Sequence, residues 1–452
     1  MPTASKHRPS TKHRPSVISL RTSSHRLACG SLHTAALLLS IAGPSLLWPV
    51  AAHATNGYFS HGYGAKGLGQ AGVGIAWGQD ALAAATNPAN TALVGDRVDA
   101  GASVFLPRRS ARIVGNAFGP DESYGGNGRK TFLIPEFGIT RQLSDQWGVG
   151  IAAYGNGGMN TDYERNPYGR FGAQGRAGVN LEQLFITPSV AWKPTPQHSF
   201  GVGLNVAYQR FSAKGIGVFS GFSSAPQQVS DQGTDSSLGA GLRLGWTGTV
   251  APGVTLGATW ASKIRGKFDD YRGLFADGGR FDVPENYGIG IAWRPNGAWT
   301  LGADLQRIRY SQGAAVGNPL APLLRGVPLG AAGGPGFGWR DVNVVKLAVA
   351  DQVSPTLTLR GGISHATQPV PSSETFLNVL APGVVQDHLT LGATWKTASG
   401  LEVTGYAAHA FGRTVRGNGS IPPGNPPAGF GGGNADVRLK ETLFGVSVGW
   451  VF

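Results

Sequence analysis

Five basic side chains are the residues best suited to bind an anion within this protein. They lie in segments where bulky and small residues alternate, and counting alternate positions places them on the face opposite the bulky residues. A basic group on an enclosed face can form a charge-assisted hydrogen bond with a carboxylate. We therefore predict inward-facing cations for an acidic ligand at Arg243, Lys263, Arg265, Lys346 and Arg360.

These cations also have a purely structural interpretation. The same counting places three carboxylates, Asp304, Glu402 and Glu441, on the inward face. Charges enclosed together can pair with one another, because an unpaired buried charge is costly. Ion pairs that brace the interior are therefore the alternative to contacts with a ligand.

Catalytic side chains would give the protein a different kind of role. A lipase-like site needs a nucleophilic Ser beside a His, and the nearest candidates, Ser364 with His365 and His409, fall at the ends of alternating segments. Cys29 is the single cysteine, and it lies in an N-terminal leader, so the mature chain has no thiol chemistry. The sequence therefore predicts no enzyme, no metal site and no cofactor.

Two segments expected to connect strands are unusually apolar for exposed loops. We predict that they form an external hydrophobic groove, where a nonpolar molecule makes its first contact with the protein. The alternative is that they fold inward and cap the interior. The residues of this predicted groove are Ile216, Val218, Phe219, Phe222, Leu320, Leu323 and Leu324.

Residues 1–54 have the features of a cleaved signal peptide. A basic region without acidic residues precedes an apolar run at 35–42, and the small-x-small site Ala52-His53-Ala54 follows. We expect the mature chain to begin at Thr55. Removing the six basic residues of 1–54 lowers the formal net charge from +13 to +7. The remaining excess is dispersed, which argues against a nucleic-acid partner.

Residues 97–452 have the composition and pattern of a transmembrane β-barrel. Charged residues make up only 14% of the chain, against about 25% in soluble domains. Roughly fourteen segments alternate bulky with small or polar residues, and an even number fits a closed antiparallel barrel with bulk toward lipid. The clearest segment is 443–452. The predicted fold class is all-β.

Tight turns and long connections follow one another in alternation along these segments, and one long connection is expected near 107–130. This order predicts short turns at the periplasmic end and long loops outside. The chain ends in Trp450 and Phe452, an aromatic terminus that we expect the assembly machinery to read. Seven tryptophans beside short turns predict an interfacial aromatic girdle: Trp147, Trp192, Trp246, Trp293, Trp299, Trp395 and Trp450.

Residues 55–96 match neither a helix nor a strand, because glycines recur and no period of two appears. The segment is nevertheless too apolar to remain in water as a tail. We predict that it is a hatch, a plug inside the barrel. Its most specific part leads through Asp80 to Asn87, Pro88 and Ala89, where Pro88 fixes its own backbone and restricts Asn87, which suits a sharp turn.

Taken in order, these motifs resemble the outer-membrane family of long-chain fatty acid and aromatic hydrocarbon transporters, the FadL/TodX or OmpP1-like type. The resemblance covers 55–452, with support from Pro135-x-Phe137-Gly138 and Leu380-Ala381-Pro382. It implies a monomeric fourteen-stranded barrel with a hatch in the outer membrane of a Gram-negative bacterium. The implied role is passive transport of a hydrophobic ligand. The implied partners are that ligand, outer-membrane lipid and lipopolysaccharide, and the barrel assembly machinery.

The resemblance also implies that ligands leave sideways, through a gap made by an inward kink of the third strand. Glycines in such a strand weaken pairing and permit a bend. Fatty-acid members of the family tend to carry a proline and bulkier residues here, so the choice between fatty acid and hydrocarbon stays open. The corresponding residues are Tyr154, Gly155, Asn156, Gly157 and Gly158.

Two other functions remain as alternatives. A general diffusion porin would need a constriction lined by opposed charges and no plug of ~40 residues. A structural or adhesive barrel would place its function in the loops and tolerate loss of the hatch. Electrical conductance would separate a porin from a plugged transporter, because a plug blocks ions.

Overall fold

The computed structural model describes residues 55–425 and 429–452. The predicted signal peptide, 1–54, lies outside the described residues. None of the helices in the described part of the chain is both long and apolar enough to cross a membrane.

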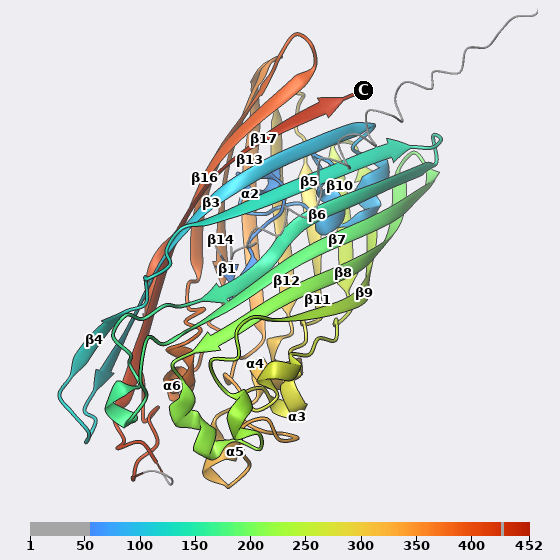
Figure 1. The fold of residues 1–452 in the computed structure, drawn as a ribbon. Coiled ribbons are helices and arrows are strands. Elements are labelled where there is room, and N and C mark those ends of the chain that lie inside the picture. Colours follow the sequence, from blue (N-terminus) through green and yellow to red (C-terminus); the bar gives the residue numbers. More distant parts are fainter. Residues whose placement is uncertain (1–54, 426–428) are drawn as a thin grey trace, which may run out of the picture. The chain divides into compact units, whose positions relative to one another are not determined.

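Fourteen long strands form one antiparallel barrel wall, as predicted (Figure 1). Each strand pairs with the next along the chain, and the wall closes where the last strand pairs with the first. The wall strands are β3 (Arg97–Val114), β5 (Phe132–Gln142), β6 (Trp147–Asn160), β7 (Gly178–Thr195), β8 (His198–Lys214), β9 (Asp235–Ala251), β10 (Val254–Ala261), β11 (Asn286–Trp293), β12 (Trp299–Ile308), β13 (Val342–Ser354), β14 (Leu357–Ala366), β15 (Asp387–Lys396), β16 (Leu401–Val415) and β17 (Asn434–Val451).

The period of two in the sequence separates lipid-facing from inward-facing side chains. In β17 the side chains of Phe444, Val446 and Val448 are exposed on the outer surface, while Leu443 is fully buried. Bulk on the outside suits hydrocarbon, and small or polar residues suit a filled interior. The girdle tryptophans are exposed beside the short turns, except Trp246, which is half-buried.

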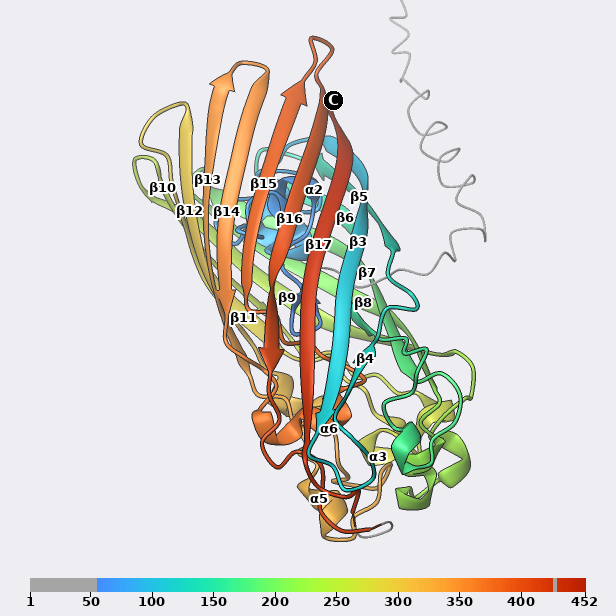
Figure 2. The same ribbon diagram turned by 90° about the vertical axis from the view of Figure 1, so that its left-hand side faces the viewer.

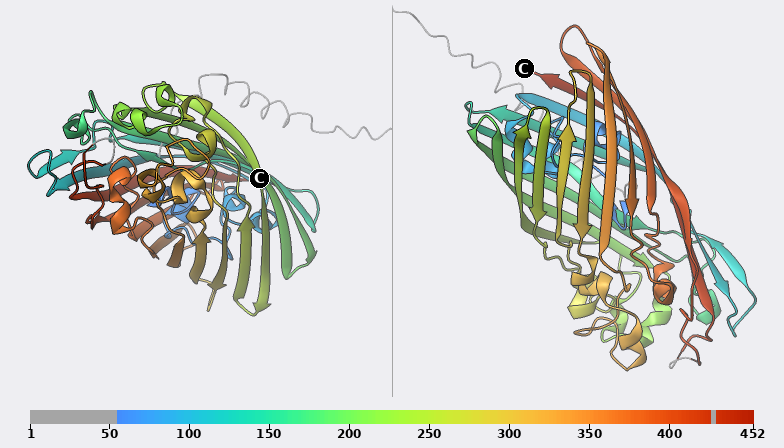
Figure 3. Two further views of the ribbon diagram at one scale, coloured as in Figure 1. Left: turned by 90° about the horizontal axis from the view of Figure 1, so that it is seen from below. Right: turned by 180° about the vertical axis from the view of Figure 1, so that it is seen from behind.

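The two ends of the barrel differ because the connections differ in length. Turns of a few residues join the strands at the end where the C-terminus lies, and the short helices gather at the opposite end (Figures 2 and 3). These helices are α3 (Ala276–Gly279), α4 (Ala314–Gly317), α5 (Ala321–Leu324), α6 (Thr375–Asn378), and the 3-10 helices η4 (Gly169–Phe171), η5 (Gly217–Phe222), η6 (Pro226–Gln228), η7 (Asp269–Tyr271), η8 (Tyr310–Gln312) and η9 (Ser372–Glu374).

One predicted loop is partly wrong. Residues 107–114 continue β3 instead of leaving the wall, and β4 (Glu122–Gly125) pairs with that extension. The continuation is possible because β17 is equally long and pairs with β3 up to Val114. Pro107 lies within β3 and is the register partner of Glu441, so the strand continues through a residue that lacks an N–H donor.

The segment from Thr55 to about Leu93 lies within the wall (Figure 1). It contains β1 (Thr55–Asn56), β2 (Phe59–Ser60), α2 (Ala65–Leu68), η2 (Ala83–Ala85) and η3 (Pro88–Ala92). Inward-facing glycines of the wall make room for it. A Cβ on Gly201 would lie 2.2 Å from the Ala89 nitrogen, and one on Gly257 would lie 2.5 Å from the Ile75 oxygen. The many glycines thus serve close backbone contact as well as barrel curvature.

Candidate functional site

Three of the five predicted inward-facing cations bind the N-terminal segment. Each is almost completely buried and donates to an oxygen of that segment. The contacts are Lys346 Nζ to the His61 carbonyl at 2.9 Å, Arg360 Nε to Gln79 Oε1 at 3.1 Å, and Arg243 to the Thr86 carbonyl at 3.2 Å. The three side chains therefore bind oxygens of the protein itself in this structure. This agrees with the interpretation that they brace the interior and not with contact to a ligand.

The other two predicted cations are placed differently. The strand β10 ends at Ala261, and Ile264 then turns into the apolar core. After the strand ends, inward-facing and outward-facing positions no longer alternate as they do within β10, and the prediction for these two cations had assumed that they would. Lys263 pairs with Asp282 at 3.6 Å, while Arg265 is exposed, so the prediction of an inward-facing Arg265 is wrong.

The inward-facing carboxylates also hold the N-terminal segment. Asp304 accepts from the backbone N–H groups of Gly74 at 2.8 Å and Ile75 at 3.1 Å. Glu402 forms an ion pair with Lys66 at 2.6 Å. Each contact joins residues more than two hundred positions apart in the chain, so the segment is tied to the wall by polar groups that the barrel encloses.

The Asn87-Pro88-Ala89 turn is a second attachment to the wall. Asn87 Nδ2 donates to the carbonyls of Ile75 at 2.7 Å and Trp246 at 3.0 Å, while its Oδ1 accepts from the Ala89 N–H and caps η3. Pro88 occupies the first position of η3, where its missing N–H has no cost. One short motif thus connects two parts of the segment with β9.

Asp80 is a buried carboxylate of the N-terminal segment. Its Oδ1 accepts from the Leu82 N–H at 3.0 Å, and a Cβ on Gly64 would lie 2.6 Å from its Oδ2. Burial, and then the neighbouring Asp99 carboxylate, raise the pKa of Asp80. The site therefore favours the neutral acid more strongly than water does.

The wall is interrupted between β5 and β6. The two strands pair only from Gln142 with Gly148 to Phe137 with Ala153. Beyond that point, residues 132–136 of β5 pair with β3, while residues 154–160 of β6 pair with β7. Beyond Phe137 and Ala153, the facing edges of β5 and β6 are therefore not paired with each other. This is the level of the predicted kink.

The predicted kink residues turn toward the interior. The register of β6 against β7 shifts between Gly155 and Gly157. Gly157 then pairs with Phe59 of β2, and the Gly158 N–H donates to the Tyr58 carbonyl at 2.9 Å. A Cβ on Gly157 would lie 1.8 Å from the Tyr58 oxygen, so this approach requires glycine.

Side chains of the same stretch form a polar chain inside the barrel. Asn156 Oδ1 accepts from the Tyr63 hydroxyl at 2.8 Å, and its Nδ2 donates to Gln183 at 3.0 Å. The Tyr154 hydroxyl lies 3.1 Å from Thr187 Oγ1. These bonds join the kink to the N-terminal segment on one side and to β7 on the other.

A small cavity lies beside the kink, between β3, β6, β17 and the 381–383 loop. Apolar side chains, including Phe105, Met159 and Leu439, form much of its lining, and Arg109 and Glu441 are its charged members. Arg109 was missed by the sequence prediction because residues 107–130 were expected to form a long connection. Its parity with Phe105 is the signal that could have identified it as inward-facing.

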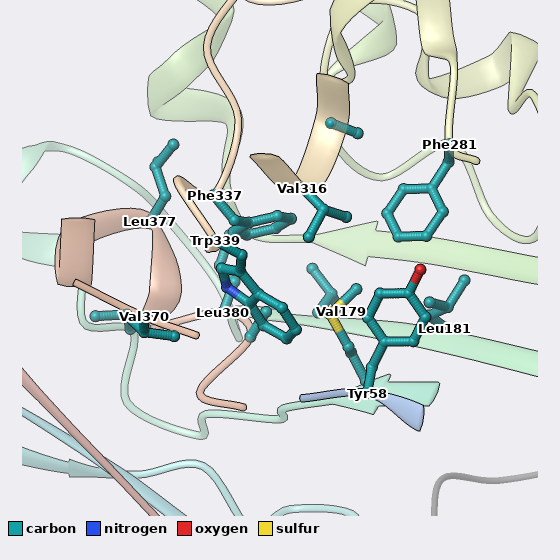
Figure 4. Packing of buried hydrophobic residues seen from close by; sticks show 14 of the residues in the cluster. Tyr58, Val179, Leu181, Phe281, Val316, Phe337, Trp339, Val370, Leu377 and Leu380 are labelled. Carbon is teal, nitrogen blue, oxygen red and sulfur yellow. The ribbon is translucent and has the colours of Figure 1, made fainter. Parts of the chain in front are cut away.

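Loop residues at the outer end belong to a large hydrophobic cluster rich in aromatic side chains, called here the aromatic cluster, part of which Figure 4 shows. Among its members, Tyr58, Tyr310 and Trp339 pack with ring centroids 5.0 to 5.9 Å apart. Trp339 Nε1 also donates to Asn378 Oδ1 at 2.5 Å. This cluster covers the outer face of the N-terminal segment.

The predicted external groove is not open in this structure. Ile216, Phe219 and Leu320 are buried in the aromatic cluster, and only Leu324 of the predicted set is exposed. The half-buried members, Val218, Phe222 and Leu323, pack against the same cluster. The loops fold inward because burying these apolar groups removes them from water.

Ile216 and Phe219 instead line a second, apolar cavity, among the loops. Each of the two cavities measures about 30 Å³, well below the ~150 Å³ of a protein cavity that holds benzene. A hydrophobic ligand therefore needs the surrounding side chains to move apart.

The aromatic C-terminus lies on the outer surface. Trp450 and Phe452 are both exposed, and the Phe452 N–H donates to the Asp96 carbonyl at 3.1 Å.

We expect deletion of Phe452 to lower the amount of folded barrel in the membrane several-fold, because the assembly signal would end in Val451. The yield of folded barrel is measured by heat-modifiable mobility on gels. The control is Phe118→Ala, which removes an exposed aromatic side chain from a loop. Equal folded yield for the deletion and the wild type would contradict this role.

The described residues contain no group of three or more His, Cys, Asp or Glu side chains arranged to hold a metal ion. What the site offers instead is two small cavities with largely apolar linings, one of which also carries Arg109 and Glu441.

Comparisons with known proteins identify the family. No curated protein matches the sequence. Among solved structures, a Pseudomonas aeruginosa FadL homologue is 18% identical, covering 88% of this chain and 100% of its own, with a TM-score of 0.64. The Pseudomonas putida toluene transporter TodX is 16% identical, covering 87% of this chain and 99% of its own, with a TM-score of 0.60. The Ralstonia pickettii toluene transporter TbuX, also 16% identical, covers 87% and 99% with a TM-score of 0.58.

At these identities the likeness to solved structures establishes the fold. The family model for outer membrane protein transport proteins (OMPP1/FadL/TodX) matches residues 50–420, which is most of the chain. The barrel is accordingly one of the Gram-negative outer membrane. The chain belongs to the OMPP1/FadL/TodX family of outer membrane transport proteins.

Proposed function

We propose that this protein passively moves hydrophobic small molecules across the outer membrane and releases them sideways between β5 and β6. The observation that supports this most is the end of β5–β6 pairing at Phe137 and Ala153, beside the cavity that Met159 lines. Unpaired strand edges are costly at the depth of a membrane. A gap in the wall is therefore a feature that needs a function.

The driving force is desolvation. A nonpolar molecule gains roughly 25 cal/mol per Å² of surface removed from water. We propose that it first enters the apolar loop cavity, which Phe219 and Phe337 line, and then reaches the cavity beside β6. Trp339 follows Phe337 of the loop cavity by two residues, and a Cβ on Gly383 of the cavity beside β6 would lie 2.5 Å from the Trp339 ring. We propose that rotation of this ring opens the route.

In this proposal residues 55–96 are a hatch that blocks the axial path. The polar attachments at Asp304, Glu402 and Asn87 hold the segment across the lumen. A general porin needs an open aqueous path, and the filled lumen argues against that alternative.

Two measurements on the purified protein test the proposal together. Proteoliposomes containing it should take up labelled laurate or toluene at least several-fold faster than empty vesicles, because a protein path removes the desolvation barrier. The same protein in planar bilayers should conduct ions close to the baseline. A large, steady ion conductance with no uptake advantage would instead indicate a porin, and neither activity would favour a structural or adhesive barrel.

We also propose that lipopolysaccharide binds to the outer surface near the loop end. Arg108 of β3 and Lys440 of β17 are direct register partners, and both are exposed. Like charges opposite each other destabilise a sheet, so a phosphate between them would relieve repulsion.

The double variant Arg108→Ala/Lys440→Ala should retain at least twofold less lipopolysaccharide after mild extraction, measured as lipid phosphate per barrel. Arg265→Ala, an exposed loop cation, is the control. Equal lipid phosphate in the double variant and the control would contradict this site.

A further inference from the structure

The first described residue, Thr55, is bound to a buried carboxylate at the other end of the chain. Its backbone nitrogen donates to Glu441 Oε2 at 2.9 Å, and its hydroxyl donates to Glu441 Oε1 at 3.2 Å. Each residue is 2% exposed. Both line the cavity beside the β6 kink.

Glu441 is a charge that lacks an ionic partner. It takes part in none of the ion pairs found within 55–425 and 429–452. The nearby Arg109 is directed elsewhere, since it donates to Asn160 Oδ1 at 3.1 Å and to the Arg129 carbonyl. A buried carboxylate without a cation at ion-pair distance is costly. The atom best placed to supply that charge is the Thr55 nitrogen.

We propose that removal of the leader completes this site: the free α-amino group of Thr55 forms a buried ion pair with Glu441, which leaves Arg109 to bind the anionic end of an amphipathic ligand. A signal peptidase would hydrolyse the Ala54–Thr55 peptide bond. Water supplies the new carboxylate oxygen on Ala54 and the hydrogen of the Thr55 amine, which then takes up a proton. This inference rests on the proposed transport function and on cleavage after Ala54.

The ligand class follows from the charges of the cavity. Arg109 and Glu441 are the charged side chains among its lining residues. With Glu441 neutralised by the α-ammonium group, the cavity keeps one net positive charge, on a guanidinium whose Nε has no hydrogen-bond partner among the described residues. Apolar neighbours such as Phe105 and Leu439 accept a hydrocarbon chain. A long-chain monocarboxylate therefore fits better than a neutral hydrocarbon.

The first experiment detects the ion pair. Mass spectrometry of the mature protein should find Thr55 at its N-terminus, and sodium cyanate, which carbamylates free amines, should modify that amine at least tenfold more slowly in the folded wild type than in Glu441→Gln. The matched control is Glu182→Gln, which changes another buried glutamate, paired with Arg129 and Arg210 outside this cavity. A different N-terminus, or fast carbamylation of the wild type, would overturn the proposal.

The second experiment measures ligand choice. Insertion of one glycine between Ala54 and Thr55 displaces the amine by one residue, and mass spectrometry verifies the new terminus. Laurate affinity should fall at least tenfold, because Glu441 then repels the carboxylate, while toluene binding should stay the same. Adding Glu441→Gln to the insertion should restore laurate affinity. Unchanged laurate affinity in the insertion variant would overturn the proposal.

The two proposals fail in different ways. If the wild type binds neither laurate nor toluene, the proposed transport function fails. If it binds both and neither the insertion nor Glu441→Gln changes laurate affinity or carbamylation, the transport proposal stands and the ion pair fails. Should the insertion variant not fold, the carbamylation of the wild type and Glu441→Gln decides alone.

Discussion

Replacing Gly157 and Gly158 with valine is expected to reduce uptake of laurate or toluene at least tenfold while the barrel still assembles. A Cβ at position 157 would lie 1.8 Å from the Tyr58 oxygen, so β6 could not keep its contact with β2. Valine favours regular strands, and residues 132–136 of β5, which pair with β3 on one side, do not pair with β6 on the other. We expect β6 to move outward and pair there, which closes the gap.

The matched control is Gly405→Val. Gly405 is an exposed residue of β16 with open space around its Cβ position, so valine there adds strand propensity without closing anything. Proteoliposome uptake and heat-modifiable mobility would be measured for both variants. Normal uptake by the double valine variant at wild-type abundance would exclude the lateral route and favour an axial path through the hatch.

Replacing Asn87 with alanine is expected to raise ion conductance several-fold by loosening the hatch. The substitution removes the Asn87 donor from the carbonyls of Ile75 and Trp246, leaving Ile75 with a longer bond from Asn90 Nδ2 at 3.4 Å, and it removes the cap of η3. Each buried group left unsatisfied costs about 1–3 kcal/mol, and a lost N-cap costs about 1 kcal/mol. The segment is then held less firmly than the strand wall, whose ladder hydrogen bonds are unchanged.

Planar bilayer recordings would measure this opening. Asn296→Ala is the control, because Asn296 accepts comparable backbone hydrogen bonds, from Ala298 and Trp299, but in an exposed turn. Conductance at the wild-type level for Asn87→Ala, with the segment equally resistant to added protease, would mean that the Asn87-Pro88-Ala89 turn does not hold the hatch.

Local patterns predicted most of the wall. The alternation in 443–452, the glycine-containing turns and the tryptophans beside them depend on neighbouring residues, and they correctly indicated fourteen strands with bulk toward lipid. The same method failed where a local pattern is altered by a distant partner. Residues 107–114 stay in β3 because β17 pairs with them, and Arg265 leaves the inward face because β10 ends at Ala261.

The partners of the enclosed charges could be decided only by the tertiary structure. Counting parity indicated that Lys346, Arg360 and Glu441 face inward, but it could not indicate what they bind, because their partners at His61, Gln79 and Thr55 lie 281 to 386 positions away. The glycines of β6 pointed to a kink in that strand, but not to its partner, because Gly157 pairs with Phe59 of β2, about one hundred positions earlier in the chain.

The sequence by itself therefore determined the barrel, the polarity of its two faces and the family, because a period of two and short motifs are properties of neighbouring residues. Only the tertiary structure decided that the inward-facing charges hold the N-terminal segment, that the apolar loops close inward, and that Arg109 and Glu441 share a cavity. The physical reason is that buried charges and apolar groups must find partners, and a closed barrel brings together partners that are remote in the chain.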